Sequence, residues 1–78
     1  MSIKVKLFAS LAESVGRREA TFDYSDGMTV GSLWESVSKE SSAAPTEILA
    51  AVNMAYCELE TVLNDGDEVA FFPPVTGG

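Results

Sequence analysis

The sequence predicts an α+β domain in which a mixed sheet of four to five strands is packed on one face by one main helix. The chain has 78 residues, which suits one small domain. Its hydrophobic content of 46% is enough for a folded core. Polar and apolar residues first alternate as in strands, and the spacing then changes to that of an amphipathic helix.

The first part of the chain predicts two strands with one short helical turn between them. Residues 3–9 alternate, with Phe8 on the outward side. We expect Ser10 to cap the helical turn and Gly16 to end it. Residues 19–24 alternate again, so the two strands are expected to pair antiparallel across a connection longer than a tight hairpin.

The main helix is predicted from residue 30 to about residue 40. Its apolar side chains recur at helical spacing and share one face: Val30, Leu33, Trp34 and Val37. Thr29 is a suitable N-cap. A loop closed by Pro45 is expected to follow the helix.

The second part of the chain predicts further strands. Residues 48–52 suit a short central strand, although the alanines there are also compatible with a helix. Asn53 tolerates the left-handed conformation and is expected to turn the chain. Residues 64–67 form a strong turn signal, and residues 68–72 predict the last strand, with Phe72 facing outward. This order of elements is that of the β-grasp fold of ubiquitin.

Composition excludes several classes of function. The chain has 12 acidic and 5 basic residues, a net charge of −7, which disfavours nucleic-acid binding. It has no histidine, the commonest metal ligand. No apolar run is long enough to span a membrane. The single cysteine, Cys57, excludes an intrachain disulfide and points to a reducing compartment, so we expect a cytoplasmic protein.

Two groups of residues that resemble chemical sites have simpler interpretations. Asp65, Asp67 and Glu68 lack the ligand number and spacing of a calcium loop, so we interpret them as a turn capped by carboxylates and predict no metal site. Cys57 has no basic or cationic neighbour in sequence to activate it, which favours a buried structural thiol.

The end of the chain is the most informative segment. We divide the chain into a domain over residues 1–72 and an extended tail over residues 73–78. The two prolines of the tail favour an extended backbone of about 19 Å, and its two final glycines can pass through a narrow channel. The alternative is a frayed terminus without function. Phe8 and Phe72, both expected on the outward face near the base of the tail, suggest a patch where a partner docks.

The chain resembles the small subunit of molybdopterin synthase, the MoaD family. The likeness is densest in DGDEVAFFPPVTGG over residues 65–78 and extends to IKVKLFASLAE over residues 3–13. It also includes Thr29, Val30 and Leu33 of the main helix and AVN over residues 51–53. The chain departs from the family in the loop over residues 41–46 and at Lys6, where the family more often has an apolar residue.

The resemblance implies a ubiquitin-like sulfur carrier with no catalytic residues of its own and no bound cofactor. In this family a separate ubiquitin-activating-type adenylyltransferase uses ATP to adenylate the terminal carboxylate, here that of Gly78, which is then converted to a thiocarboxylate. The tail enters the large synthase subunit, within a heterotetramer of two small and two large subunits, and donates sulfur to a cyclic pyranopterin phosphate. The tail positions are Pro73, Pro74, Val75, Thr76 and Gly77. Phe8 and Phe72 match the family's contact surface for its partners.

Three alternatives remain at this point. Carriers for thiazole synthesis or tRNA thiolation also end in two glycines on this fold. A ubiquitin-like protein modifier would use the same tail chemistry until the last nucleophile, which would be a lysine. The third is an interaction domain whose tail is inert.

Overall fold

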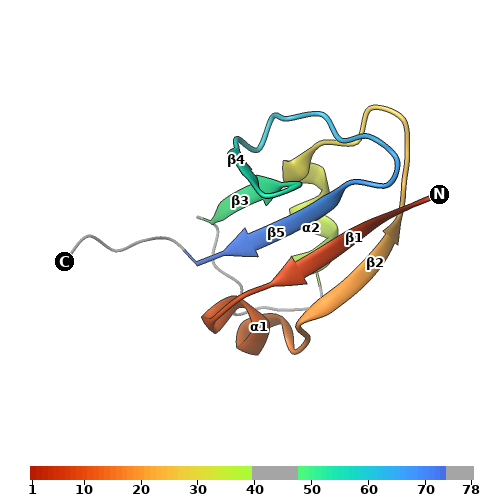
Figure 1. Cartoon of the computed structure of the whole chain (residues 1–78). Coiled ribbons are helices and arrows are strands. Elements are labelled where there is room, and N and C mark those ends of the chain that lie inside the picture. Colours follow the sequence, from red (N-terminus) through yellow and green to blue (C-terminus); the bar gives the residue numbers. More distant parts are fainter. Residues whose placement is uncertain (40–47, 74–78) are drawn as a thin grey trace.

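The computed structural model of this chain describes residues 1–39 and 48–73, which form one sheet and two helices (Figure 1). In chain order the elements are β1 (Ser2–Leu7), α1 (Ser10–Val15), β2 (Glu19–Asp23), α2 (Val30–Ser38), β3 (Leu49–Val52), β4 (Ala55–Cys57) and β5 (Glu68–Phe72). The predicted loop over residues 41–46 lies outside the described residues.

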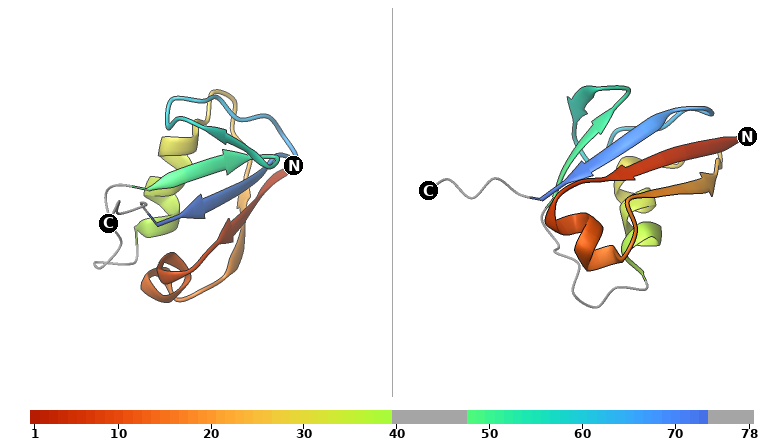
Figure 2. Two further views of the ribbon diagram at one scale, coloured as in Figure 1. Left: turned by 60° about the vertical axis from the view of Figure 1, so that its left-hand side comes forward. Right: turned by 60° about the horizontal axis from the view of Figure 1, so that its bottom comes forward.

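The five strands form a single mixed sheet in the order β2-β1-β5-β3-β4. β1 pairs antiparallel with β2, as predicted, and parallel with β5 at the centre of the sheet. β3 pairs antiparallel with both β5 and β4. The helix α2 lies against one face of this sheet, and no helix within residues 1–39 and 48–73 covers the other face, which we call the open face (Figure 2). The predicted α+β layout is therefore confirmed.

The core lies between the sheet and α2. The four apolar residues predicted on one face of the main helix are all buried, and so are the inward residues of β1 and β5. The buried cluster consists of Ile3, Val5, Leu7, Leu11, Val30, Leu33, Trp34, Val37, Ala50, Leu63, Val69 and Phe71. Trp34 packs against Phe71 with ring centroids 5.0 Å apart, which makes it a core residue as expected.

The start of α2 is closed by a capping box. Thr29 Oγ1 accepts a hydrogen bond from the backbone N–H of Ser32 at 3.1 Å, and Ser32 Oγ accepts one from the backbone N–H of Thr29 at 3.0 Å. The N–H of Gly31 donates to the carbonyl of Leu59 at 2.9 Å. A Cβ atom on Gly31 would lie 3.2 Å from that carbonyl oxygen, so a larger residue would push the Leu59 backbone away by a few tenths of an ångström.

The cap predicted for α1 is wrong. Ser10 is the first helical residue, and the N-cap is Ala9, whose side chain makes no hydrogen bond. The carbonyl oxygens of Phe8 and Ala9 accept hydrogen bonds from the N–H groups of Leu11 and Ala12, both at 3.1 Å. Backbone oxygens therefore satisfy these N–H groups in place of the Ser10 hydroxyl. At the start of this helix Ala9 has φ 53° and ψ −134°, a conformation that strains any residue except glycine.

A polar network ties the β3–β4 hairpin to the start of β5. Asn53 has the expected left-handed conformation, with φ 49°. Its Nδ2 donates to Asp67 Oδ1 at 2.9 Å, and its Oδ1 accepts from the N–H of Glu68 at 3.0 Å. The N–H of Asn64 donates to Asp67 Oδ2 at 2.8 Å, so the nearly buried Asp67 carboxylate caps the predicted turn.

Candidate functional site

The open face of the sheet brings together the two aromatic residues predicted to dock a partner. β1 and β5 run parallel with Leu7 beside Phe71, so Phe8 and Phe72 follow side by side. Their rings are stacked, with centroids 4.9 Å apart and planes inclined by only 11°. Phe8 is 42% exposed. Phe72 is half-buried, which corrects the expectation that it faces solvent freely, because neighbouring rings flank it.

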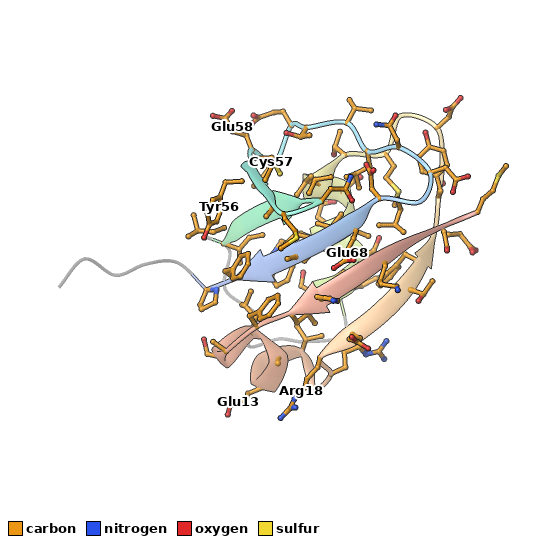
Figure 3. The ribbon with its side chains drawn as sticks, viewed as in Figure 1. Glu13, Arg18, Tyr56, Cys57, Glu58 and Glu68 are labelled. Carbon is orange, nitrogen blue, oxygen red and sulfur yellow. The ribbon has the colours of Figure 1, made fainter. Side chains whose placement is uncertain are left out.

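The sequence analysis missed a third ring at this site. Tyr56 of β4 is 76% exposed, and its ring centroid lies 6.0 Å from that of Phe72. Leu49 of β3 is in register with Phe72 and is also exposed. We name Phe8, Leu49, Tyr56 and Phe72 the docking patch. Figure 3 shows Tyr56 near the end of the sheet where β5 finishes. The signal available in sequence was the alternation Ala55-Tyr56-Cys57, which is too short to assign a face.

Charged residues continue the open face away from the docking patch. Lys6 Nζ lies 3.1 Å from Glu68 Oε1, and both side chains are partly exposed. Lys4 is in register with Glu68 on the neighbouring strand. An exposed pair of this kind contributes less than about 1 kcal/mol to stability. The face is therefore apolar at the end where β5 finishes and ionic toward its middle.

The docking patch lies at the base of the predicted tail. Pro73 follows β5 directly, is half-buried and is the last described residue. The remaining tail positions lie outside the described residues, so the tail itself stays a prediction: Pro74, Val75, Thr76, Gly77 and Gly78.

Cys57 faces the interior rather than the docking patch. It is in register with Ala50, which belongs to the core, and its thiol lies 3.7 Å from the Ala50 carbonyl oxygen as a weak donor. The thiol is half-buried rather than buried as predicted, because β4 is the edge strand. Neither helix among residues 1–39 and 48–73 is long and apolar enough to cross a membrane.

Comparison with known proteins gives one consistent result. The ThiS family matches residues 5–78. The molybdopterin synthase sulfur carrier subunit of Escherichia coli (strain K12) is 43% identical and is aligned over 97% of this chain and 99% of its own. The crystal structure of SAMP1 from Haloferax volcanii has a TM-score of 0.79 at 30% identity, with both chains covered completely.

A further structure supports the fold alone. It is the complex of subunits 1 and 2 of the molybdopterin-converting factor from Helicobacter pylori, which matches with a TM-score of 0.70 at 21% identity and full coverage of both chains. These neighbours confirm the predicted ubiquitin-like β-grasp fold. The chain thus belongs to the ThiS family and, within it, to the sulfur carrier subunits of molybdopterin synthase.

Proposed function

We propose that the sulfur atom is carried on the C-terminal carboxyl group of Gly78. The observation that carries this proposal is the placement of the docking patch at the end of β5, directly before Pro73. A partner that covers this patch would therefore also lie next to Pro73, where the predicted tail begins. The family match that extends to residue 78 supports the same terminal position.

The chemistry needs two displacements, because a carboxylate is a poor electrophile. A carboxylate oxygen of Gly78 attacks the α-phosphorus of ATP, and pyrophosphate leaves. Hydrosulfide or an equivalent sulfur nucleophile then attacks the acyl carbon, and AMP leaves with the oxygen, which yields a thiocarboxylate. An adenylyltransferase of the ubiquitin-activating type binds the ATP and catalyses these steps. Within this chain Gly78 provides the acyl group.

The second half of the proposal concerns the acceptor. The thiocarboxylate enters the large subunit of molybdopterin synthase and donates its sulfur to a cyclic pyranopterin phosphate, with the catalytic residues supplied by the large subunit. Residues 73–77 span the distance from the docking patch to that active site. Two small and two large subunits form the working complex in the cytoplasm. The Escherichia coli relative, which is named as a subunit of molybdopterin synthase, supports such a partner.

Intact-mass measurement tests the terminal position of the sulfur. Wild-type protein is incubated with the adenylyltransferase, ATP and a sulfur donor, and the expected gain is the mass difference between sulfur and oxygen. One extra residue after Gly78 displaces the carboxylate by about 3 Å, beyond the tolerance of about 0.5 Å for reacting groups. The extended protein is therefore expected to fold normally and to acquire no sulfur. Sulfur uptake at the wild-type rate would refute the proposal.

Docking is tested by charge insertion into the patch. Tyr56→Asp is the cleanest variant because this ring is the most exposed, and Phe8→Asp and Phe72→Asp extend the series. Each substitution should lower the affinity for the large subunit at least tenfold, because aromatic residues at the centre of an interface contribute much of its binding energy. Val62→Asp, at a 58% exposed position outside the patch, is the matched control and should bind normally. Equal losses for Tyr56→Asp and Val62→Asp would contradict docking at this face.

A second candidate is conjugation to lysine side chains of other proteins. The likeness to the archaeal modifier SAMP1 favours it. The two functions share the adenylate and differ in the nucleophile that follows. The mass of the protein isolated from its own cells separates them, because a conjugate carries a second polypeptide and a thiocarboxylate does not.

A further inference from the structure

Two arginines stand beside the docking patch. Arg17 and Arg18 form the connection between α1 and β2 and are both exposed. The N–H of Leu7 donates to the carbonyl of Arg18 at 2.8 Å, which fixes this connection next to the end of β1, one residue before Phe8. Figure 3 shows Arg18 extending outward close to Glu13. Among the described residues no carboxylate forms an ion pair with either guanidinium.

A shallow hollow joins the arginines to the patch. It lies between the end of β1, α1 and the start of β2, and its side chains include Lys6, Phe8, Glu13, Arg17, Arg18 and Glu19. Cations outnumber carboxylates in this lining, whereas in the whole chain 12 acidic residues oppose 5 basic ones. Lys6 is paired with Glu68, so Arg17 and Arg18 are the cations of this hollow that form no ion pair among the described residues. Phe8 belongs to both the hollow and the docking patch.

The opposite end of the sheet is acidic. β2 runs antiparallel to β1, so it starts beside the arginines and finishes at Asp23, next to the start of β1. The hydroxyl of Tyr24 donates to Asp26 Oδ1 at 3.3 Å. Partial burial raises the pKa of Tyr24 most, and the carboxylates of Asp26, Asp65 and Asp67 raise it further.

Among the described residues, the two arginines therefore lie at the end of the strands that carries the docking patch, and Asp23 and Asp26 lie at the other end. We infer that Arg17 and Arg18 contact an acidic surface of the large synthase subunit, beside the channel that receives the tail. This inference rests on the proposed function. Such a surface attracts the arginines and repels the carboxylates at the other end, so the carrier approaches tail first. The large subunit is the indicated partner because the hollow is continuous with the patch that we propose it covers.

Association kinetics test this inference with a matched pair of variants. Arg18→Glu and Lys39→Glu each replace one exposed cation by a carboxylate, so both change the net charge of −7 equally. Lys39 is the C-cap of α2 and is not part of the hollow. At low ionic strength, Arg18→Glu is expected to lower the association rate constant for the large subunit about fivefold, and Lys39→Glu less than twofold. At about 1 M salt, where the Debye length is about 3 Å, the difference should disappear.

A variant that removes a negative charge from the hollow completes the test. Glu13→Gln removes a carboxylate from the hollow, so it is expected to raise the same rate constant at low ionic strength about twofold. Equal effects of Arg18→Glu and Lys39→Glu would overturn the inference, because they would indicate a response to net charge alone. In that case wild-type protein would still bind the large subunit and donate sulfur, so the proposed function would stand. Absence of wild-type binding would instead refute both.

Discussion

Replacing Ala9 by glycine is expected to stabilise the domain. Ala9 is exposed and has φ 53° with ψ −134°, so its Cβ atom creates strain that no packing contact in the core offsets. Strain of this kind costs about 1–3 kcal/mol. Glycine removes this strain, but its greater conformational entropy stabilises the unfolded chain by about 0.4–1 kcal/mol. The net gain is about 1 kcal/mol, which raises the melting temperature of a domain of this size by about 4–8 °C.

Thermal unfolding followed by circular dichroism measures this change, and Ala12→Gly provides the control. Ala12 lies inside α1 and its carbonyl accepts the N–H of Gly16, so glycine at position 12 should destabilise the domain by about 0.5–1 kcal/mol. Both variants replace an alanine by glycine, but Ala9→Gly is expected to raise the melting temperature and Ala12→Gly to lower it. A melting temperature for Ala9→Gly equal to or below that of the wild type would refute the strain argument.

Three further predictions follow from contacts described above. Gly31→Ala should lower the free energy of unfolding by about 1 kcal/mol in urea titrations, because the cost of about 1–3 kcal/mol for its methyl group against the Leu59 carbonyl exceeds the gain of about 0.5–1 kcal/mol for alanine over glycine in a helix; an unchanged midpoint would contradict that contact. Asp67→Ala should cost about 1–3 kcal/mol in the same assay, since it leaves the partners of a nearly buried carboxylate unpaired; a loss below 0.5 kcal/mol would argue against the network. Cys57→Ser should leave sulfur transfer intact, because we propose that the sulfur is carried on Gly78; inactivity of a folded variant, with the wild-type melting temperature, would restore a role for the thiol.

Features that depend on local spacing were predictable from the sequence. The face of α2, its Thr29 cap and the inward residues of β1 and β5 all follow from periodicity within a few residues. The N-cap of α1 was mispredicted because hydrogen bonds to the backbone compete with a serine hydroxyl there, and sequence does not rank the two. Tyr56 was missed because its neighbour Phe72 is brought to it by the pairing of β3 with both β4 and β5. Phe8 and Phe72 were both identified, but their stacking depends on the parallel register of β1 and β5.

The central pairing of β1 with β5 also has a consequence for biosynthesis. It joins the first strand to the last described strand, so this contact spans nearly the whole chain and has a high contact order. On the ribosome β1 is made long before its partner, and Phe8 has no stacked neighbour until β5 emerges. An incomplete or misfolded carrier therefore lacks the docking patch. A partner that binds this patch therefore recognises only chains in which β1 and β5 have paired.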